Sequence, residues 1–230
     1  PVDEKTASQE GWLEQLVQSS SEDPEKMRVE LVNAVEMISP EKLQSTVKLV
    51  LEEHRDTFFT SSAAISMHHA YRSGLLEHTV RMARCCQSLL PHYPEVHPGL
   101  ALAGTILHDV GKTLEYTQGM ITEKTRSGIL QGHVVLGYRI VRKAAIQSSL
   151  DPDLLERLEH IILSHQGELE WGAAVKAATP EAVFVSMIDN LDAKMGMAQE
   201  ALRQAPADKE FSDYLPGLGT SLLLDRPDTD

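Results

Sequence analysis

The sequence has few aromatic residues, only two cysteines and no long apolar run. Aromatic residues are 5% of the chain, which argues against the stacking surfaces that hold single-stranded nucleic acid. The cysteines, Cys85 and Cys86, are adjacent and cannot join distant segments, so we expect buried core thiols and a reducing compartment. Because we find no signal peptide and no run of about 18 apolar residues, we expect a cytoplasmic protein with no membrane partner.

Positive charge is also scarce. Lys and Arg number 21 against 34 Asp and Glu, which gives a formal net charge of −13. Such a chain does not bind polyanions through general electrostatics. If it acts on nucleic acid or nucleotides, local basic residues, metal ions or another domain must hold them.

Strand patterns of convincing length are missing, and apolar residues recur at helical spacing through almost the whole chain. Asp23-Pro24, Ser39-Pro40 and Asp151-Pro152 each read as an N-cap followed by proline at the first helical position. The expected helices cover residues 9–19, 24–37, 41–53, 73–90, 97–109, 129–147, 152–165 and 180–203. Residues 114–126 are the best place for a short hairpin or an ordered loop.

These patterns predict an all-α fold. We expect a polar N-terminus and helical lead-in over residues 1–60, a core domain over 61–204 and a C-terminal tail over 205–230. The hydrophobic content of 42% is enough for a proper buried core.

The informative residues are histidines and aspartates placed in apolar helices. His78 lies between Leu75 and Met82, the pair His108-Asp109 closes the apolar stretch 100–107, and Asp189 follows the apolar stretch 183–188. An ionised aspartate in such surroundings costs several kcal/mol unless it is paired or metal-bound. Helices that each direct a His or Asp inward can build a metal site in a bundle. Imidazole with carboxylate suits Mn, Fe, Co, Ni, Zn or Mg.

The simpler interpretation is a set of ordinary core histidines and a chance His-Asp pair. The combination argues against it, because the pair is followed by Gly111-Lys112 and is accompanied by an inward His before it and an inward Asp after it. On the helix 152–165, at about 100° per residue, His165 falls in the middle of the apolar arc and His160 on the opposite side. His133 shares a helical face with Leu130, Val134 and Gly137.

These residues carry a resemblance to a known family. Gly-Leu-Leu-Glu-His78-Thr, Leu-His108-Asp109-Val-Gly-Lys112 and Ile-Asp189-Asn-Leu-Asp-Ala-Lys resemble the H…HD…D signature of HD-domain phosphohydrolases. Within that superfamily the chain is similar to the YhaM-like 3′–5′ exoribonucleases over residues 55 to 200. The matching segments are His68-His69-Ala-Tyr, Gly-His133-Val-Val-Leu-Gly, Ile-Leu-Ser-His165-Gln-Gly-Glu-Leu-Glu-Trp171-Gly and Asp189-Asn-Leu-Asp-Ala-Lys-Met.

The resemblance implies an HD-domain helical bundle with one or two divalent metal ions in its core, for which we favour Mn or Fe. One metal would be held by His78, His108, Asp109 and Asp189, and a second by Asp109, His133 and His165. The metals would lower the pKa of a bound water and neutralise phosphate oxygens. Lys112 would bind phosphate as a point charge, so Asp109, His108 and Lys112 are the expected catalytic residues.

Two features depart from the family. Gln166 stands where bimetallic relatives often have another histidine, which weakens the second site. The exoribonucleases also carry an N-terminal OB-type nucleic-acid-binding domain, and no strand-rich segment precedes residue 60. Because the sequence begins at Pro1, we expect either that this domain has been cut away or that the HD core acts on smaller substrates.

Several other residues leave two interpretations open. His69 and Arg72 either belong to a loop that caps a helix or contact substrate phosphate. For His160 we favour a position behind the ligands or on the surface over direct metal binding. Asp192 either hydrogen-bonds a metal-bound histidine or pairs near Lys194. For Trp171 we favour packing over base stacking. We interpret the basic residues Arg139, Arg142 and Lys143 as a solvated face of one helix.

The predicted site residues are compatible with four functions. The leading one is a 3′–5′ exonuclease on single-stranded RNA or DNA, and the second is a phosphatase for nucleotides or other small phosphate-containing substrates. The third is an HD-like di-iron oxygenase, which needs a strong second site. The fourth is a non-catalytic metal-binding module, against which the His-Asp-Lys set argues. A homo-oligomer is compatible with the sequence.

Overall fold

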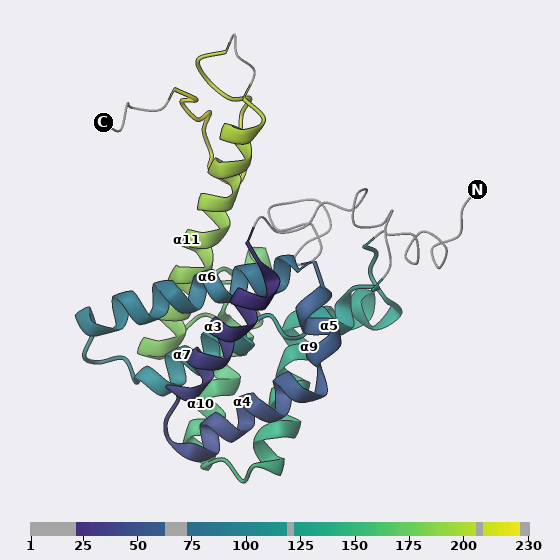
Figure 1. The fold of residues 1–230 in the computed structure, drawn as a ribbon, viewed down its shortest axis with the longest axis vertical. Coiled ribbons are helices and arrows are strands. Elements are labelled where there is room, and N and C mark those ends of the chain that lie inside the picture. Colours follow the sequence, from purple (N-terminus) through teal and green to yellow (C-terminus); the bar gives the residue numbers. More distant parts are fainter. Residues whose placement is uncertain (1–21, 63–72, 119–121, 206–208, 226–230) are drawn as a thin grey trace.

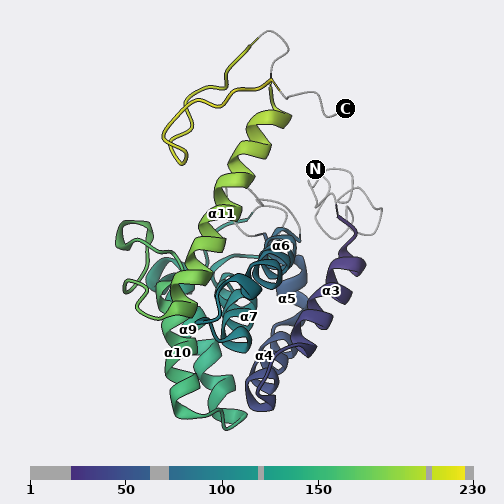
Figure 2. The same ribbon diagram turned by 90° about the vertical axis from the view of Figure 1, so that its left-hand side faces the viewer.

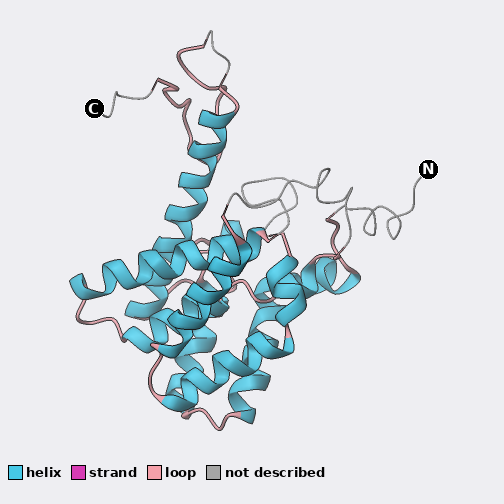
Figure 3. Cartoon of the chain, viewed as in Figure 1, coloured by secondary structure: helices cyan, strands magenta, loops and turns pink. Residues whose placement is uncertain are grey.

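The computed structural model describes residues 22–62, 73–118, 122–205 and 209–225, and helices dominate these ranges (Figure 3). The predicted all-α fold is confirmed. The α-helices are α3 Pro24–Glu36, α4 Glu41–Glu53, α5 Arg55–Thr60, α6 Gly74–Leu89, α7 Pro98–Leu107, α8 Lys112–Glu115, α9 Arg126–Gln147, α10 Pro152–Ser164 and α11 Pro180–Arg203. Two short 3₁₀ turns follow α6 and α10, η1 Leu90–His92 and η2 Leu169–Trp171.

The helix predictions hold to within a few residues, and the helix expected over 9–19 lies outside the described residues. Asp23 and Asp151 cap α3 and α10 as expected. The prediction of Ser39 as an N-cap is wrong by one position. The N-cap of α4 is Pro40, which makes no side-chain cap hydrogen bond. Within 114–126, an isolated antiparallel bridge joins Tyr116 and Lys124.

Helix α7 forms the centre of the bundle and contacts α4, α6, α10 and α11 (Figure 1). Every residue from Gly99 to Leu107 is buried, as expected for a helix that is apolar all round. The side chain of His97 caps its first turn by accepting a hydrogen bond from the backbone N–H of Leu100. The end of α7 therefore delivers His108 and Asp109 into the middle of the fold.

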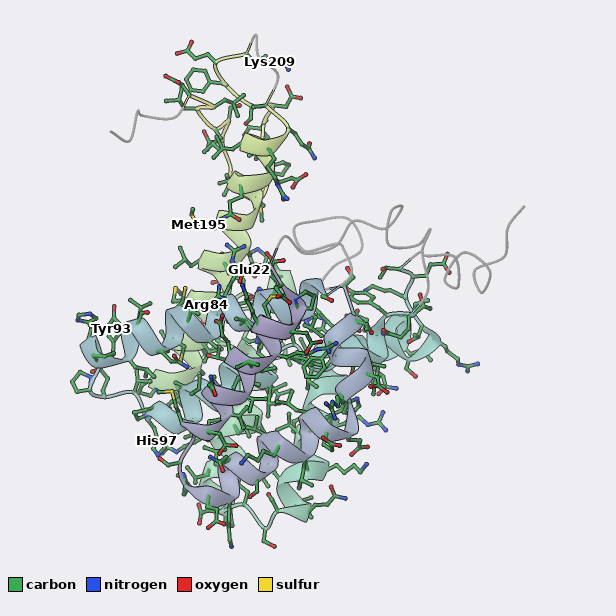
Figure 4. All side chains as sticks on the ribbon, viewed as in Figure 1. Glu22, Arg84, Tyr93, His97, Met195 and Lys209 are labelled. Carbon is green, nitrogen blue, oxygen red and sulfur yellow. The ribbon has the colours of Figure 1, made fainter. Side chains whose placement is uncertain are left out.

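The helical lead-in packs onto the same core. Met27 and Leu31 of α3 and Leu43 and Val47 of α4 belong to one continuous apolar cluster with α6, α7, α9, α10 and α11. An ion pair between Glu22 and Arg84 also ties the start of α3 to α6 (Figure 4). The domain boundaries at residues 60 and 204 stay predictions.

Two glycines decide how α9 meets the centre. A Cβ on Gly111 would lie 1.9 Å from the carbonyl oxygen of His133, so only glycine lets α8 approach α9 this closely. Gly132 has φ 69° and breaks the helical geometry of α9. The predicted shared face is therefore wrong at Leu130, which is exposed, whereas Val134 and Gly137 beyond the break are buried.

Helix α11 runs past the bundle, and residues 209–225 lie at its far end (Figures 1 and 2). Among the described helices, none is both long enough and apolar enough to cross a membrane.

Candidate metal centre

Three helices bring the first group of predicted ligands together. His78 comes from α6, His108 and Asp109 from the end of α7, and Asp189 from α11. His78 Nε2 lies 3.1 Å from His108 Nε2 and 3.4 Å from Asp189 Oδ1. Asp109 Oδ2 is 3.3 Å from His108 Nε2 and 3.7 Å from His78 Nε2. The donor atoms of His78, His108 and Asp109 thus lie close enough together to hold one metal ion.

Asp109 also belongs to a second group. Its Oδ1 atom lies 3.5 Å from His133 Nε2 on α9 and 3.6 Å from His165 Nε2 at the end of α10. This group too is compact enough to hold a metal ion. One carboxylate therefore faces two sets of histidines, with one oxygen directed to each set.

All four histidines are oriented in the same sense. Their Nδ1 atoms contact acceptors outside the centre, which are Asp192 for His78, the Thr105 carbonyl for His108, Glu115 for His133 and the Ile162 carbonyl for His165. Those four distances lie between 2.7 and 2.9 Å. An acceptor at Nδ1 selects the tautomer that keeps the lone pair on Nε2, the atom that binds metal. The Nε2 atoms all face Asp109.

Charged side chains outside the ligand groups hold two of these histidines. Asp192 hydrogen-bonds His78, the first of the two interpretations for this residue, and its other oxygen lies 3.1 Å from Arg81 Nε. Glu115 lies between His133 and Lys124, with Nζ of Lys124 at 2.9 Å. None of the predicted site residues was Arg81, Glu115 or Lys124, because only the fold brings these positions to the histidines.

The electrostatics of the centre favour positive charge. Burial lowers the pKa of His78, but hydrogen bonds to Asp189 and Asp192 outweigh it and raise that pKa to about 9. Without a metal ion this imidazole therefore carries a second proton near neutral pH, which a bound metal would displace from Nε2. Burial raises the pKa of Asp189, yet the nearby histidines lower it to about 2. For Asp109, Lys112 and His108 outweigh burial and hold the pKa well below its usual range. The carboxylates stay ionised in a buried place and require a cation.

Lys112 lies beside this cluster. Its Nζ atom is 2.5 Å from Asp109 Oδ2, and although burial lowers its pKa, the charge of Asp109 raises it overall. The ammonium group is therefore paired with the shared carboxylate. Lys112, Asp189 and His133 have side chains 14 to 18% exposed, more than the other ligand residues, so solvent reaches the centre beside them.

Gln166 lies against the two histidines of the second group. Its amide nitrogen lies 3.2 Å from His133 Nε2 and 3.0 Å from His165 Nε2. The amide thus contacts both histidines of the second group, and the weakness of the second site stays a prediction.

A divalent metal fits the residues present. Among the described residues, the buried Oδ1 atom of Asp109 finds no hydrogen-bond partner, although a buried carboxylate oxygen ordinarily has one. Around it are imidazole nitrogens held with their lone pairs inward and a second buried carboxylate, a donor set suited to borderline and hard divalent ions. Two groups of side chains, which share Asp109, are thus compact enough to hold a metal ion.

The remaining predicted residues lie apart from the ligands. His160 accepts a hydrogen bond from the backbone N–H of Ala178 and so fixes the segment before α11. Trp171 is 56% exposed in η2, so the expectation that it packs into the protein is wrong. Cys86 is buried but Cys85 only half-buried. His68, His69 and Arg72 lie outside the described residues.

The basic residues of α9 behave as a solvated face. Arg142 pairs with Glu159, Lys143 pairs with Glu53, and Arg139 donates a hydrogen bond to Gln131. Their charges are met by neighbouring side chains on the surface.

Known proteins resemble this chain over most of its length. The 3′–5′ exoribonuclease YhaM of Shouchella clausii (strain KSM-K16) is 34% identical over 206 residues, which are 90% of this chain and 64% of that protein. The protein of the same name from Listeria monocytogenes (serotype 4b, strain CLIP80459) is 34% identical over 84% of this chain and 62% of its own length. For Listeria innocua the values are 32%, 95% and 67%.

The chain thus spans 62 to 67% of the length of these relatives. No solved structure matches it. The HD domain family matches residues 75–194, which include His78, the His108-Asp109 pair, His133, His165 and Asp189. The chain therefore belongs to the HD domain family and, within it, to the YhaM-like group.

Proposed function

We propose that this chain is a metal-dependent phosphodiester hydrolase that removes nucleotides from the 3′ end of single-stranded RNA or DNA. The observation that carries the proposal is the inward orientation of four histidine Nε2 atoms around the buried carboxylate of Asp109. A purely structural metal site needs neither a shared carboxylate nor a lysine on that carboxylate. The printed activity of the relatives, 3′–5′ exoribonuclease, supplies the direction and the substrate class.

We assign the first metal to His78, His108, Asp109 and Asp189 and the second to Asp109, His133 and His165, with Mn or Fe favoured. A bound divalent metal supplies water activation near neutral pH and neutralises phosphate charge. Asp109 orients both ligand groups because it has one oxygen in each. Asp192 and Glu115 keep His78 and His133 in the tautomer that ligates.

The phosphate is proposed to enter beside Lys112, on the solvent-exposed side of the centre. Lys112 keeps its proton, because its pKa is raised by Asp109, so it can hold a phosphate oxygen as a point charge. This local cation matters in a chain of net charge −13. We propose that an OB-type domain outside this sequence holds the rest of the strand, as the greater length of the relatives supports. A cytoplasmic location belongs to the same proposal.

The test is hydrolysis by the purified, chelator-stripped protein with Mn²⁺ added back. The substrates are a 5′-labelled single-stranded RNA and a panel of nucleoside monophosphates, and Asp109→Ala is the inactive control. The expected result is a ladder of 3′-shortened RNA that is absent with the variant. Intact RNA together with a folded, metal-loaded protein would overturn the proposal.

A nucleotide phosphatase is the second candidate. Gln166 between the two histidines of the second group favours it, because a single strong metal suffices for a small substrate. The acidity of the chain points the same way. Release of inorganic phosphate from monophosphates, with RNA left intact, would select this function.

A further inference from the structure

Helix α11 has a packed half and a projecting half. From Pro180 to Gly196 one face is buried against α6, α7 and α10. Beyond Gly196, no described residue up to Asp225 is buried. Figures 1 and 2 show the helix running out of the bundle, and Figure 4 labels Met195 at the end of the packed half and Lys209 near the tip of the projecting stretch. We name residues 197–225 the arm.

The outer face of α11 carries an apolar ridge formed by Val183, Met187, Leu191 and Met195. Each of the four side chains is between 46 and 61% exposed. They are spaced four residues apart, so they form one of the rows by which helices pack into each other's grooves. Scattered exposed apolar residues are ordinary, but a contiguous apolar row on a monomer marks an interaction surface.

The arm continues this apolar surface. Two isolated bridges, Phe211 with Leu223 and Leu215 with Thr220, give it a hairpin form. A Cβ on Gly217 would lie 2.3 Å from Met197 Sδ, so the hairpin lies directly on α11. Its large side chains Phe211, Tyr214 and Leu223 are 48 to 63% exposed. The hairpin therefore packs on α11 with one side and leaves these large apolar side chains open to a partner on the other.

We propose that the ridge and the arm form a two-fold interface between two copies of this chain. The midpoint of the ridge lies between Met187 and Leu191, so an antiparallel crossing at this point sets Met187 of one copy against Leu191 of the other. The same crossing lays the arm of each copy beside the packed half of its partner's α11. The projecting half of α11 in each copy would thus lie against the packed half of α11 in the other copy. Such mutual pairing of the same two surfaces is what a two-fold interface requires.

Charge favours a second copy over a polyanion as the occupant. In the described part of the arm, Arg203 pairs with Glu200 and Lys209 pairs with Asp213, so no cation there is left for phosphate. Two copies of net charge −13 repel each other, and an uncharged row is where they can meet. With roughly 150–200 Å² for each fully exposed large side chain, the ridge and hairpin offer about 600 Å² per copy. Stable interfaces bury about 600 to 1,000 Å² per partner, so this surface reaches the lower end of that range.

The test is the mass of the whole chain in solution, measured by light scattering after size exclusion at micromolar concentration. We expect twice the chain mass of 25.4 kDa. In Met187→Glu/Leu191→Glu, each copy would bury two unpaired carboxylates, so the dimer dissociation constant should rise about 100-fold or more. Loss of residues 206–230 should weaken the dimer less.

The matched control is Ile146→Glu, which replaces an equally exposed apolar residue on α9. It should keep the dimer, and all variants should keep their helical circular dichroism. A wild-type chain of single mass, or a ridge variant that folds and still dimerises, would overturn the proposal. So would an assembly that both the ridge variant and the Ile146 variant weaken equally.

Discussion

The two halves of the metal centre share Asp109 but differ in how firmly the protein holds them. In the first half, His78 and His108 are almost fully buried, and Asp192 with Arg81 stands behind His78. In the second half, His133 follows a break in α9 and is partly exposed. Gln166 contacts both of its histidines.

The difference has a physical consequence for metal binding. The first half has two carboxylates, Asp109 and Asp189, whereas the second shares only Asp109. A divalent ion binds more tightly where more negative charge is fixed around it and where the ligands are already oriented. The first site should therefore fill at lower metal concentration than the second, and the Asp192, Glu115 and Gln166 variants test this order.

The largest effect is expected from Asp109→Ala, because this residue serves both halves. Loss of the shared carboxylate removes a ligand from each group and leaves Lys112 without its partner. We expect hydrolysis to fall by about 10³-fold or more, since metal assistance contributes several kcal/mol. Bound metal, measured by mass spectrometry of the dialysed protein, should fall with it. Asp153→Ala, at an exposed position, should leave both values unchanged.

Asp192→Asn tests the support of the first half alone. An asparagine keeps the size of the side chain but removes the charge that holds the Nδ1 proton of His78. We expect the affinity of the first metal to fall about 10- to 100-fold, the usual effect of losing such a partner. The measurement is a competition titration with a chelator.

Glu115→Gln is the matching change in the second half. It should leave the first metal affinity within a factor of about two and reduce only the second binding event. Equal losses of the first metal in the Asp192 and Glu115 variants would contradict the order of the two sites.

Gln166→His addresses the weaker half directly. The amide nitrogen already lies about 3 Å from His133 and His165 Nε2, so an imidazole at this position adds a ligand where the amide gives none. We expect the second metal to bind about tenfold more tightly, with little change at the first. Metal stoichiometry at rising Mn²⁺ concentration measures it, and Gln166→Leu should lack the gain.

The sequence predicted candidate ligands for both halves of the centre. Buried ligands such as His165 could be placed because a straight helix fixes their angle from the apolar residues around them. The same argument failed for Leu130, since one glycine with positive φ, Gly132, changes the phase of the helix. Helices α5 and α8 escaped prediction because six and four residues are too few to show a period.

Contacts between distant segments could not be predicted. Arg81 and Glu115 gain their roles only when α6 meets α11 and when α8 meets α9. Trp171 was expected to pack because it is large and apolar, yet it lies in a short turn with too little protein around it. Because Trp171 is exposed, its replacement should have the smallest of the predicted effects.

Trp171→Ala tests on which side of the centre a base of the substrate lies. The Trp171 ring lies about 4.0 Å from the place that a Cβ on Gly167 would occupy, and Gly167 directly follows Gln166, so this exposed ring lies on the same side as Gln166. Stacking on an exposed aromatic contributes about 1 kcal/mol at its lower end. We therefore expect KM for single-stranded RNA to rise about fivefold while kcat and the rate on a small phosphodiester stay unchanged. Trp171→Phe should restore most of the loss, because the aromatic face is kept. An unchanged KM would contradict stacking of a substrate base on Trp171.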